Sequence, residues 1–503
     1  MRATYLKRVF LFIAFLTVII SPSWAQSPTL VADINPGTTG AEPKSFTVFN
    51  NKLYFRASTP ASGHELWQYD GINPPTMVAD LYPGPDNGVL YYSEEPGMAV
   101  FNNKLYFSGR TPATGYELYS YDGVNPPALA FELAPGTGDG SAIPFGVFDN
   151  KLICTGLTPR GKHELYLYDG VNPPVLHEDR LASIPSFPNS FAIYNGKLYY
   201  SSRDVITGYE LTVYDPVLNT VSLVGEVQPG SGSSWPGNLT VVGGKLYFSA
   251  DGNYGTELYS YDGTTINRLT DIATGSFSGL MQSPNVCLMA YNNKVYLSGS
   301  TDGRNYQLYD YDPATNTTNL FSTINPAGNS ATFFIAVHDG KLYFKAASSN
   351  SGNELYSTDG TTTALVAEIY PGPSNGFFGR SSVSWNGALY FCGGNATVGY
   401  ELYKLQTSTA GVQSVRFDGT IIVSPNPTQS TAQLELELKN ARSVQVSLTD
   451  LTGRKVYQSK PLDCISGKTV LSLPMQDLSP GTYLYNLSDT EEGLLQSGQV
   501  IKQ

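Results

Sequence analysis

A motif of about 20 residues recurs eight times between residues 51 and 405, and this repeat limits the possible fold more than any other feature. The first copy begins Asn51-Lys52-Leu53-Tyr54-Phe55 and ends, after a glycine-containing loop, in Glu65-Leu66-Trp67-Gln68-Tyr69-Asp70-Gly71. The Glu position returns at intervals of 46 to 52 residues. A period of this length in an all-β pattern is typical of a β-propeller with one blade per repeat.

Each repeat contains four strand signals, which in the first copy are Phe46–Phe49, Lys52–Ala57, Glu65–Tyr69 and Thr76–Leu81. Pairs of turn-forming residues, such as Asn50-Asn51 and Asp70-Gly71, separate the strands of each hairpin. A lone strand, Thr29–Ile34, precedes the first repeat, whereas the last repeat stops after its third strand at Leu405. We therefore expect the N-terminal strand to complete the last blade of an all-β, eight-bladed propeller, because this closure pairs two edges that would otherwise be open.

Two carboxylates recur in the repeat, and their repetition favours structural roles, since a catalytic residue need occur only once. The Glu is expected to accept hydrogen bonds from backbone amides of the adjoining loop, as a latch, and the Asp to form a turn. The Glu positions are Glu65, Glu117, Glu164, Glu210, Glu257, Glu354 and Glu401, with Gln307 in the sixth repeat. The Asp positions are Asp70, Asp122, Asp169, Asp262 and Asp359.

The N-terminal segment predicts export. Basic residues precede a hydrophobic run, Val9–Ile20, that is too short to span a bilayer comfortably, and Ser23-Trp24-Ala25 fits a cleavage site. We interpret residues 1–25 as a signal peptide, and no later segment looks membrane-spanning. Its removal would take the net charge from −12 to −15. Such an acidic chain is a poor partner for nucleic acid or an anionic membrane.

The four cysteines, Cys154, Cys287, Cys392 and Cys464, are too scattered to suggest a disulfide framework. We expect them to be buried thiols, because a free cysteine packs as a small hydrophobic residue.

The repeat pattern ends near Thr407, so we place the propeller at residues 26–406 and a linker at 407–421. A separate domain follows at 422–503, beginning with strand signals such as the strictly alternating Ala432–Leu438. We expect a small antiparallel β-sandwich of about 80 residues there.

The repeat resembles that of Glu-Leu-Trp-x-x-Asp-Gly-Thr repeat proteins. Its closest copies are Glu65–Gly71 and Glu354–Thr361, although most copies have Tyr where the family has Trp. The resemblance implies a propeller-like fold in an exported bacterial protein and no established chemistry.

The C-terminal region resembles the type A sorting domain of the type IX secretion system. The matching segments occur in order and are Ser424-Pro425-Asn426-Pro427-Thr428, Asp450-Leu451-Thr452-Gly453-Arg454, Gly481–Leu487 and Val500–Lys502. The resemblance implies a Bacteroidota-type bacterium and the type IX machinery as a partner. It also implies passage through the periplasm to the outer surface or the medium, usually with cleavage of the domain.

Loops that differ between repeats are where binding usually resides on a repeated scaffold. Their aromatic side chains would suit stacking on sugar rings or gripping a peptide, although they could equally fill gaps between blades. The candidate ligand-binding residues are Tyr91, Tyr92, Phe145, Trp235, Phe277, Phe377 and Phe378. Asp86 and Asp139 could supply oxygen ligands to Ca²⁺, though ordinary turn formation is an alternative, and no other cofactor is indicated.

The sequence contains no nucleophile elbow, P-loop or dinucleotide fingerprint. The leading hypothesis is therefore a non-enzymatic, secreted or surface-displayed scaffold that binds an extracellular glycan or protein. One alternative is a polysaccharide-active enzyme, a glycosidase or lyase, with a non-repeated acid such as Asp86, Glu94, Glu95 or Asp139 at the propeller mouth. Another is a structural component of a surface layer or matrix.

Overall fold

The computed structural model describes residues 27–90, 97–177, 184–281, 287–407, 419–424, 426, 428–438, 442–450, 455–464, 466–489 and 493–502. All regular secondary structure in these residues is β-strand, and they contain no helix long and apolar enough to cross a membrane. The expected signal peptide lies outside the described residues.

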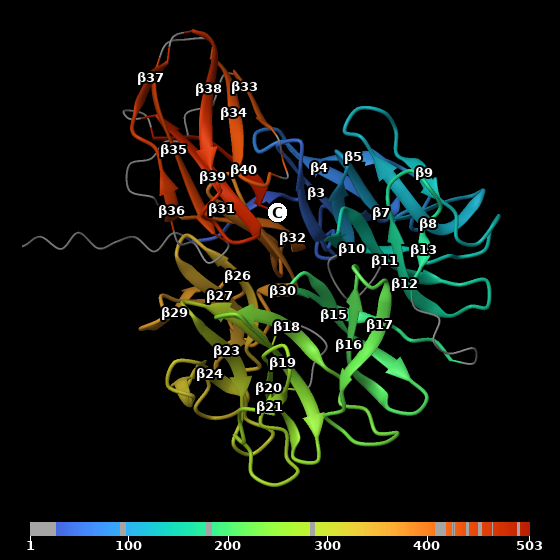
Figure 1. Cartoon of the computed structure of the whole chain (residues 1–503), viewed down its shortest axis with the longest axis vertical. Coiled ribbons are helices and arrows are strands. Elements are labelled where there is room, and N and C mark those ends of the chain that lie inside the picture. The colour runs from blue at the N-terminus through green and yellow to red at the C-terminus, as the bar shows by residue number, and fades with distance from the viewer. Residues whose placement is uncertain are drawn as a thin grey trace, which may run out of the picture.

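Eight four-stranded antiparallel sheets occupy the described part of residues 27–407 (Figure 1). Seven of them contain four strands that follow one another in the chain. Sheet 1 contains β2 (Lys44–Phe49), β3 (Lys52–Thr59), β4 (Gly63–Tyr69) and β5 (Thr76–Ala79), and sheet 2 contains β6 (Met98–Phe101), β7 (Lys104–Thr111), β8 (Thr114–Tyr121) and β9 (Ala128–Phe131). Sheet 3 contains β10 (Ile143–Phe148), β11 (Lys151–Leu157), β12 (His163–Tyr168) and β13 (Val175–Leu176). Sheet 4 contains β14 (Asn189–Tyr194), β15 (Lys197–Asp204), β16 (Gly208–Asp215) and β17 (Thr220–Gly225). Sheet 5 contains β18 (Gly237–Val242), β19 (Lys245–Gly252), β20 (Gly255–Tyr261) and β21 (Ile266–Arg268). Sheet 6 contains β22 (Leu288–Tyr291), β23 (Lys294–Gly299), β24 (Gln307–Asp312) and β25 (Thr317–Ser322). Sheet 7 contains β26 (Phe333–His338), β27 (Lys341–Ala347), β28 (Asn353–Thr358) and β29 (Thr363–Ala367).

Sheet 8 differs because its fourth strand comes from the other end of the repeat region. It consists of β30 (Phe377–Trp385), β31 (Ala388–Asn395) and β32 (Gly399–Gln406), completed by β1 (Thr29–Ala32). The strands β1 and β32 are antiparallel, with Thr29 opposite Lys404 and Leu30 opposite Tyr403. The expected pairing of the N-terminal strand with the last repeat is thus confirmed.

The sheets pack against one another in chain order. One cluster of buried hydrophobic side chains joins each pair of successive sheets, and a further cluster joins sheet 8 to sheet 1 through residues such as Trp385, Tyr390 and Phe55. First strands of neighbouring sheets also contact each other, for example β2 with β6 and with β30. Second strands are buried on both faces, which explains continuous apolar runs such as Leu53-Tyr54-Phe55.

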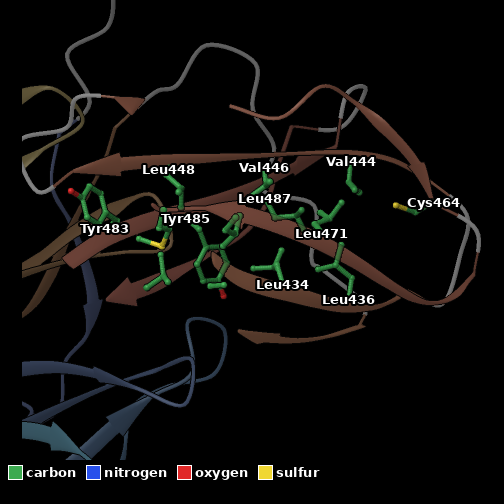
Figure 2. Packing of buried hydrophobic residues seen from close by; sticks show 14 of the residues in the cluster. Leu434, Leu436, Val444, Val446, Leu448, Cys464, Leu471, Tyr483, Tyr485 and Leu487 are labelled. Carbon is green, nitrogen blue, oxygen red and sulfur yellow. The ribbon is translucent and has the colours of Figure 1, made fainter. Parts of the chain in front are cut away.

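A second β-rich unit lies beyond residue 419 and consists of two sheets. One contains β33 (Gly419–Ser424), β34 (Thr431–Leu438) and β38 (Gly467–Pro474). The other contains β36 (Lys455–Gln458), β35 (Arg442–Asp450), β39 (Gly481–Asp489) and β40 (Gly493–Lys502), with β37 (Leu462–Cys464) paired to β35. Figure 2 shows their shared core, in which Leu434 and Leu436 of one sheet meet Val446 and Leu487 of the other. The alternating pattern of residues 432–438 places its leucines in this core, as a strand with one buried face requires.

Asn426 connects the start of this unit to its last strand. Its side-chain amide donates to the carbonyl oxygen of Gln499 at 3.0 Å, and its side-chain oxygen accepts from the Ile501 amide at 2.8 Å. Thr428 also donates its amide to the carbonyl of Ile501. The Pro-Asn-Pro entry therefore fixes the position of β40.

Candidate functional site

The repeated Glu side chains are buried and accept hydrogen bonds from the loop that leads to the next sheet. Glu117 is fully buried, and its carboxylate accepts from the amides of Leu133 at 2.7 Å, Ala134 at 2.9 Å and Gly140 at 2.9 Å. Glu401 makes the same contacts across the closure, with Ile34, Asn35 and Ala41 as donors. We call this arrangement of a carboxylate and its loop amides the latch.

The sixth repeat has an amide in place of the carboxylate and forms a modified latch. The Gln307 side-chain oxygen accepts from the amides of Ile324 at 2.9 Å and Asn325 at 3.1 Å. Its nitrogen donates instead to the carbonyls of Asn325 and Gly328. A neutral side chain can therefore hold the loop, so the latch does not depend on negative charge.

Burial changes the acidity of the latch carboxyls. It raises the pKa of Glu65, Glu354 and Glu401 to about 7, against the opposing effect of the backbone hydrogen bonds. These side chains contact loop backbone from inside the sheet assembly, so they are poorly placed for a substrate.

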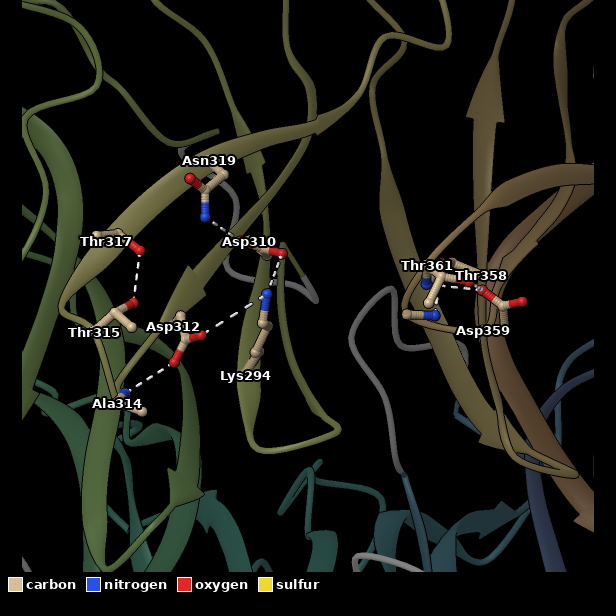
Figure 3. Close-up of polar contacts among 11 residues, drawn as sticks. Lys294, Asp310, Asp312, Ala314, Thr315, Thr317, Asn319, Thr358, Asp359 and Thr361 are labelled. Carbon is tan, nitrogen blue, oxygen red and sulfur yellow. Dashed lines mark hydrogen bonds and ion pairs between the residues drawn. The ribbon is translucent and has the colours of Figure 1, made fainter.

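The repeated Asp residues sit in the turns between third and fourth strands. Asp359 Oδ1 accepts from the amides of Thr361 and Thr362, both at 2.8 Å, and Asp312 accepts from Ala314 in the equivalent turn of sheet 6 (Figure 3). The same bonds lower the pKa of Asp359 below its ordinary value. These are the contacts of an Asx turn. Equivalent contacts hold the turns at Asp70, Asp122, Asp169 and Asp262.

A different position in the same loops carries side chains that vary. The residue two before the first strand has a left-handed φ of 45–48° in five sheets. We call these the corner residues; they are Glu42, Ser141, Phe187, Trp235 and Ala331. A bulky residue rarely adopts this conformation, which costs on the order of 1–3 kcal/mol.

Two successive corner residues, Phe187 and Trp235, present exposed aromatic rings. Trp235 is 51% exposed and stacks on Tyr209, with ring centroids 3.8 Å apart and an angle of 20° between the planes. Phe187 is 41% exposed and stacks on His163 at 5.6 Å. Each corner amide also donates to the backbone carbonyl of the residue on which its ring stacks. The backbone that strains the corner therefore also orients its ring.

Phe377 lies at the position equivalent to Trp235, but its side chain is buried and does not face the loop surface. It is 1% exposed and stacks on Phe391 in the cluster between sheets 7 and 8. Its φ is not left-handed, so its side chain turns into the core, as do those of Val89 and Leu280 in sheets 2 and 6. Each of these three residues pairs with a glycine of the second strand, where an added Cβ would come within 3.2 Å or less of a neighbouring aromatic ring; the glycines are Gly109, Gly299 and Gly393.

The other aromatic candidates occupy several environments. Phe145 is half-buried against Phe191 between sheets 3 and 4, so it fills a gap. Phe277 is 59% exposed, and Phe378 is half-buried with its ring on Tyr400 at 4.4 Å. Tyr91 and Tyr92 lie outside the described residues, as do Glu94 and Glu95 of the enzymatic alternative.

The two suggested calcium ligands each have another polar partner. Asp139 accepts a hydrogen bond from the Tyr116 amide at 2.8 Å, and Asp86 lies 3.9 Å from the Arg110 guanidinium. Within the part of the chain that the structure describes, no three His, Cys, Asp or Glu side chains are grouped to hold a metal. The four cysteines are buried thiols that form no disulfide with one another, as the sequence predicts.

Sequence reasoning missed a cluster of cations at the junction of sheets 7, 8 and 1. Lys44 and Arg56 face each other across β2 and β3 and are 8% and 1% exposed. Lys345 and Arg380 both lie over the ring of Phe333, at 4.9 and 5.4 Å from its centroid. A usable signal existed, because the aligned position of the second strand is Arg56 or Lys345 here but Ser, Thr or Cys in the other six repeats.

A pocket of about 570 Å³ lies elsewhere, against β1 and the outer part of sheet 7. Its lining includes Leu30, Glu368 and Tyr403. None of the corner residues or clustered cations lines it.

The comparisons with known proteins identify the C-terminal unit. Residues 423–502 match the model of the secretion system C-terminal sorting domain. This domain indicates export by the type IX secretion system to the cell surface or the medium. No curated protein sequence matches the chain.

Several solved structures are similar at low identity. PorZ, a surface component of the type IX secretion system of Porphyromonas gingivalis, is 14% identical with a TM-score of 0.41 over 90% of this chain and 64% of PorZ. A puromycin hydrolase is 13% identical with a TM-score of 0.45 over 82% of this chain and 60% of the hydrolase. A fungal alcohol oxidase is 10% identical with a TM-score of 0.42 over 95% of this chain and all of the oxidase. At these scores none of them bears on activity, and the chain spans less than two thirds of the first two.

Proposed function

We propose that residues 26–406 form a closed eight-bladed propeller of the Glu-Leu-Trp-x-x-Asp-Gly-Thr repeat type that binds an extracellular glycan after export. One observation carries the proposal. Trp235 and Phe187 are exposed, strained and stacked at equivalent corners of adjacent sheets.

The arrangement suits a sugar polymer better than a catalytic reaction. Flat aromatic faces on successive repeats can each cover the apolar face of one sugar ring, since aromatic side chains offer large, rigid contact areas at low entropic cost. The corners precede first strands that contact their neighbours, so they gather around the inner side of the sheets. The recurrent carboxylates are meanwhile engaged with loop amides and turns.

The test is a glycan array on the purified protein, followed by calorimetric titration of the best ligand. Trp235→Ala and Phe187→Ala should each weaken binding about tenfold or more, a loss of about 1.4 kcal/mol. Val217→Ala is the matched control, because Val217 is 89% exposed at the opposite, turn end of sheet 4. Absence of any glycan ligand, or full affinity in the Trp235 variant, would overturn the proposal.

A further inference from the structure

We propose that the glycan is bound as the interior of a linear, neutral polysaccharide that crosses three successive loops on one face of the sheets. This inference rests on the glycan-binding function proposed above and specifies the length and the charge of the ligand. The three loops join sheet 3 to sheet 4, sheet 4 to sheet 5 and sheet 5 to sheet 6.

Exposed aromatic side chains are confined to this part of the molecule. Within the part of the chain that the structure describes, four side chains of Phe, Tyr and Trp are more than one third exposed: Phe187, Trp235, Tyr254 and Phe277. Phe187, Trp235 and Phe277 lie one in each of the three successive loops, and Tyr254 lies between β19 and β20 of sheet 5. The described residues of the other loops between sheets contain no such ring.

Phe277 is held in place without being covered. A Cβ atom on Gly303, in the loop between β23 and β24 of sheet 6, would lie 3.4 Å from Phe277 Cβ and 3.6 Å from Phe277 Cδ1. One side of the aromatic residue therefore rests on that loop. The carbonyl of the next residue, Ser278, accepts from the Tyr306 hydroxyl at 3.4 Å. Phe277 is nevertheless 59% exposed, so it has one supported side and one side open to solvent, like Trp235.

Contacts between neighbouring loops join two of these rings to the loop between sheets 4 and 5. The side-chain amide of Gln228, in that loop, donates to the side-chain oxygen of Asn253 at 3.2 Å. Asn253 directly precedes Tyr254. The residue after Tyr254 is Gly255, which lies so close to Phe277 that an added Cβ would overlap the carbonyl of Phe277. The exposed Asn253 amide therefore lies among the rings, where it suits hydrogen bonds with sugar hydroxyls.

The two corner rings are joined in a similar way. The residue before Phe187 is Ser186, whose carbonyl accepts from the Arg203 amide at 2.8 Å. Arg203 pairs with Tyr209 across β15 and β16. Trp235 stacks on Tyr209, so a continuous set of contacts leads from one corner ring to the next.

The extent and the openness of this surface indicate the kind of ligand. Packed sheets lie about 10 Å apart, so three successive loops span on the order of 20 Å, which is longer than a disaccharide. None of the four rings lines the pocket of about 570 Å³, so they form an open surface that suits the interior of a chain better than its end. The protein carries a net charge of −12, which would repel an acidic polymer and favours a neutral one.

The experiment measures affinity against chain length by calorimetry on the purified protein. The probes are cello-, xylo-, manno- and N-acetylchito-oligosaccharides of two to six units. In at least one series, we expect the hexamer to bind at least tenfold more tightly than the dimer. Reduction of the hexamer's terminal sugar to an alditol should leave its affinity unchanged. Equal affinities for dimer and hexamer, or loss of binding on reduction, would overturn the extended interior site.

Variants test whether the third loop takes part. Phe277→Ala should weaken hexamer binding at least tenfold and dimer binding less than threefold. Phe277→Leu keeps an apolar contact with Gly303 but lacks the flat ring, so it should weaken hexamer binding as well. Phe378→Ala is the matched control, because Phe378 is half-buried at the start of sheet 8, outside the three loops, and it should change neither affinity.

The outcomes separate this inference from the function on which it rests. Hexamer binding that needs Trp235 but is unchanged in both Phe277 variants would leave the glycan function standing and overturn the three-loop site. An equal loss in Phe378→Ala would also overturn that site, because binding would then extend beyond the three loops. Absence of any ligand, both on the array and among the hexamers, would overturn the glycan function itself.

Discussion

The latch and the corner are adjacent in the chain, yet they behave in opposite ways. The residue that donates to the latch directly precedes the corner, as Gly140 precedes Ser141 and Ala41 precedes Glu42. The latch is buried and nearly uniform across the eight repeats, whereas the corner varies from Ala331 to Trp235. The difference teaches that a uniform residue fixes the backbone while the next position is left free to change.

The largest expected effect comes from breaking the latch that spans the closure. Deleting residues 26–34 removes β1 and one of the three amides that bind Glu401, that of Ile34. Sheet 8 would then expose the edge of β32, so the free energy of unfolding should fall by on the order of 5 kcal/mol, a large fraction of ordinary domain stability. Thermal unfolding measures the loss, and adding a peptide of residues 27–35 should partly restore it. Equal melting temperatures for both proteins would contradict the closure.

A single latch should matter less but still clearly. Glu117→Ala leaves one buried and two partly buried amides without their acceptor, which at about 1–3 kcal/mol per group should cost about 3 kcal/mol or more in urea unfolding. Glu117→Gln should cost roughly half as much, because Gln307 shows that an amide oxygen holds two of the loop amides. Equal losses in the two variants would mean that the latch depends on charge.

The latches also predict a pH dependence. The folded pKa of about 7 at Glu65, Glu354 and Glu401 lies above the ordinary 4.5, so the folded state binds more protons between these values. The stabilising contribution is complete below pH 4.5 and is lost as the pH rises through 7. Relative to the single variant Glu354→Gln, wild type should lose about 2.5 kcal/mol between pH 5 and pH 8. Both proteins contain the same histidines, so the difference between their unfolding free energies cancels the histidine contributions. Unfolding free energies that change equally with pH in the two proteins would refute the raised pKa of the latch carboxyls.

The smallest effect on stability should come from the corners. Trp235→Gly relieves a left-handed φ but removes a stacked ring, so the unfolding free energy should change by less than about 1 kcal/mol. Leu280 occupies the equivalent loop position before sheet 6 but is buried, so Leu280→Gly is the control. It should lower the unfolding free energy by at least about 3 kcal/mol. A large loss at Trp235 would make the corner a structural residue and remove its contrast with the latch.

Much of the fold could be predicted because the repeat displays it eight times. The strands, the Asp turns and the pairing of β1 follow from local patterns that recur, and the sorting domain from segments in fixed order. The candidate site was harder to predict, because the sequence does not show whether the backbone φ of a single aromatic residue is left-handed. The second strand does not supply this information either. Gly393 pairs with the buried Phe377, yet Gly156 occupies the same position in sheet 3, where the corner residue Ser141 has a left-handed φ.

The junction between β1 and β32 has a consequence for the order of events in synthesis. Residues made early must wait for a partner made some 370 residues later, so the ring cannot be completed until the last repeat has emerged. Contacts between such distant segments slow folding, because the loop entropy is lost before they form. Until that moment the two strand edges are open to pairing with other chains. A chain destined to cross two membranes could thus be kept in an incomplete state until its final strand arrives.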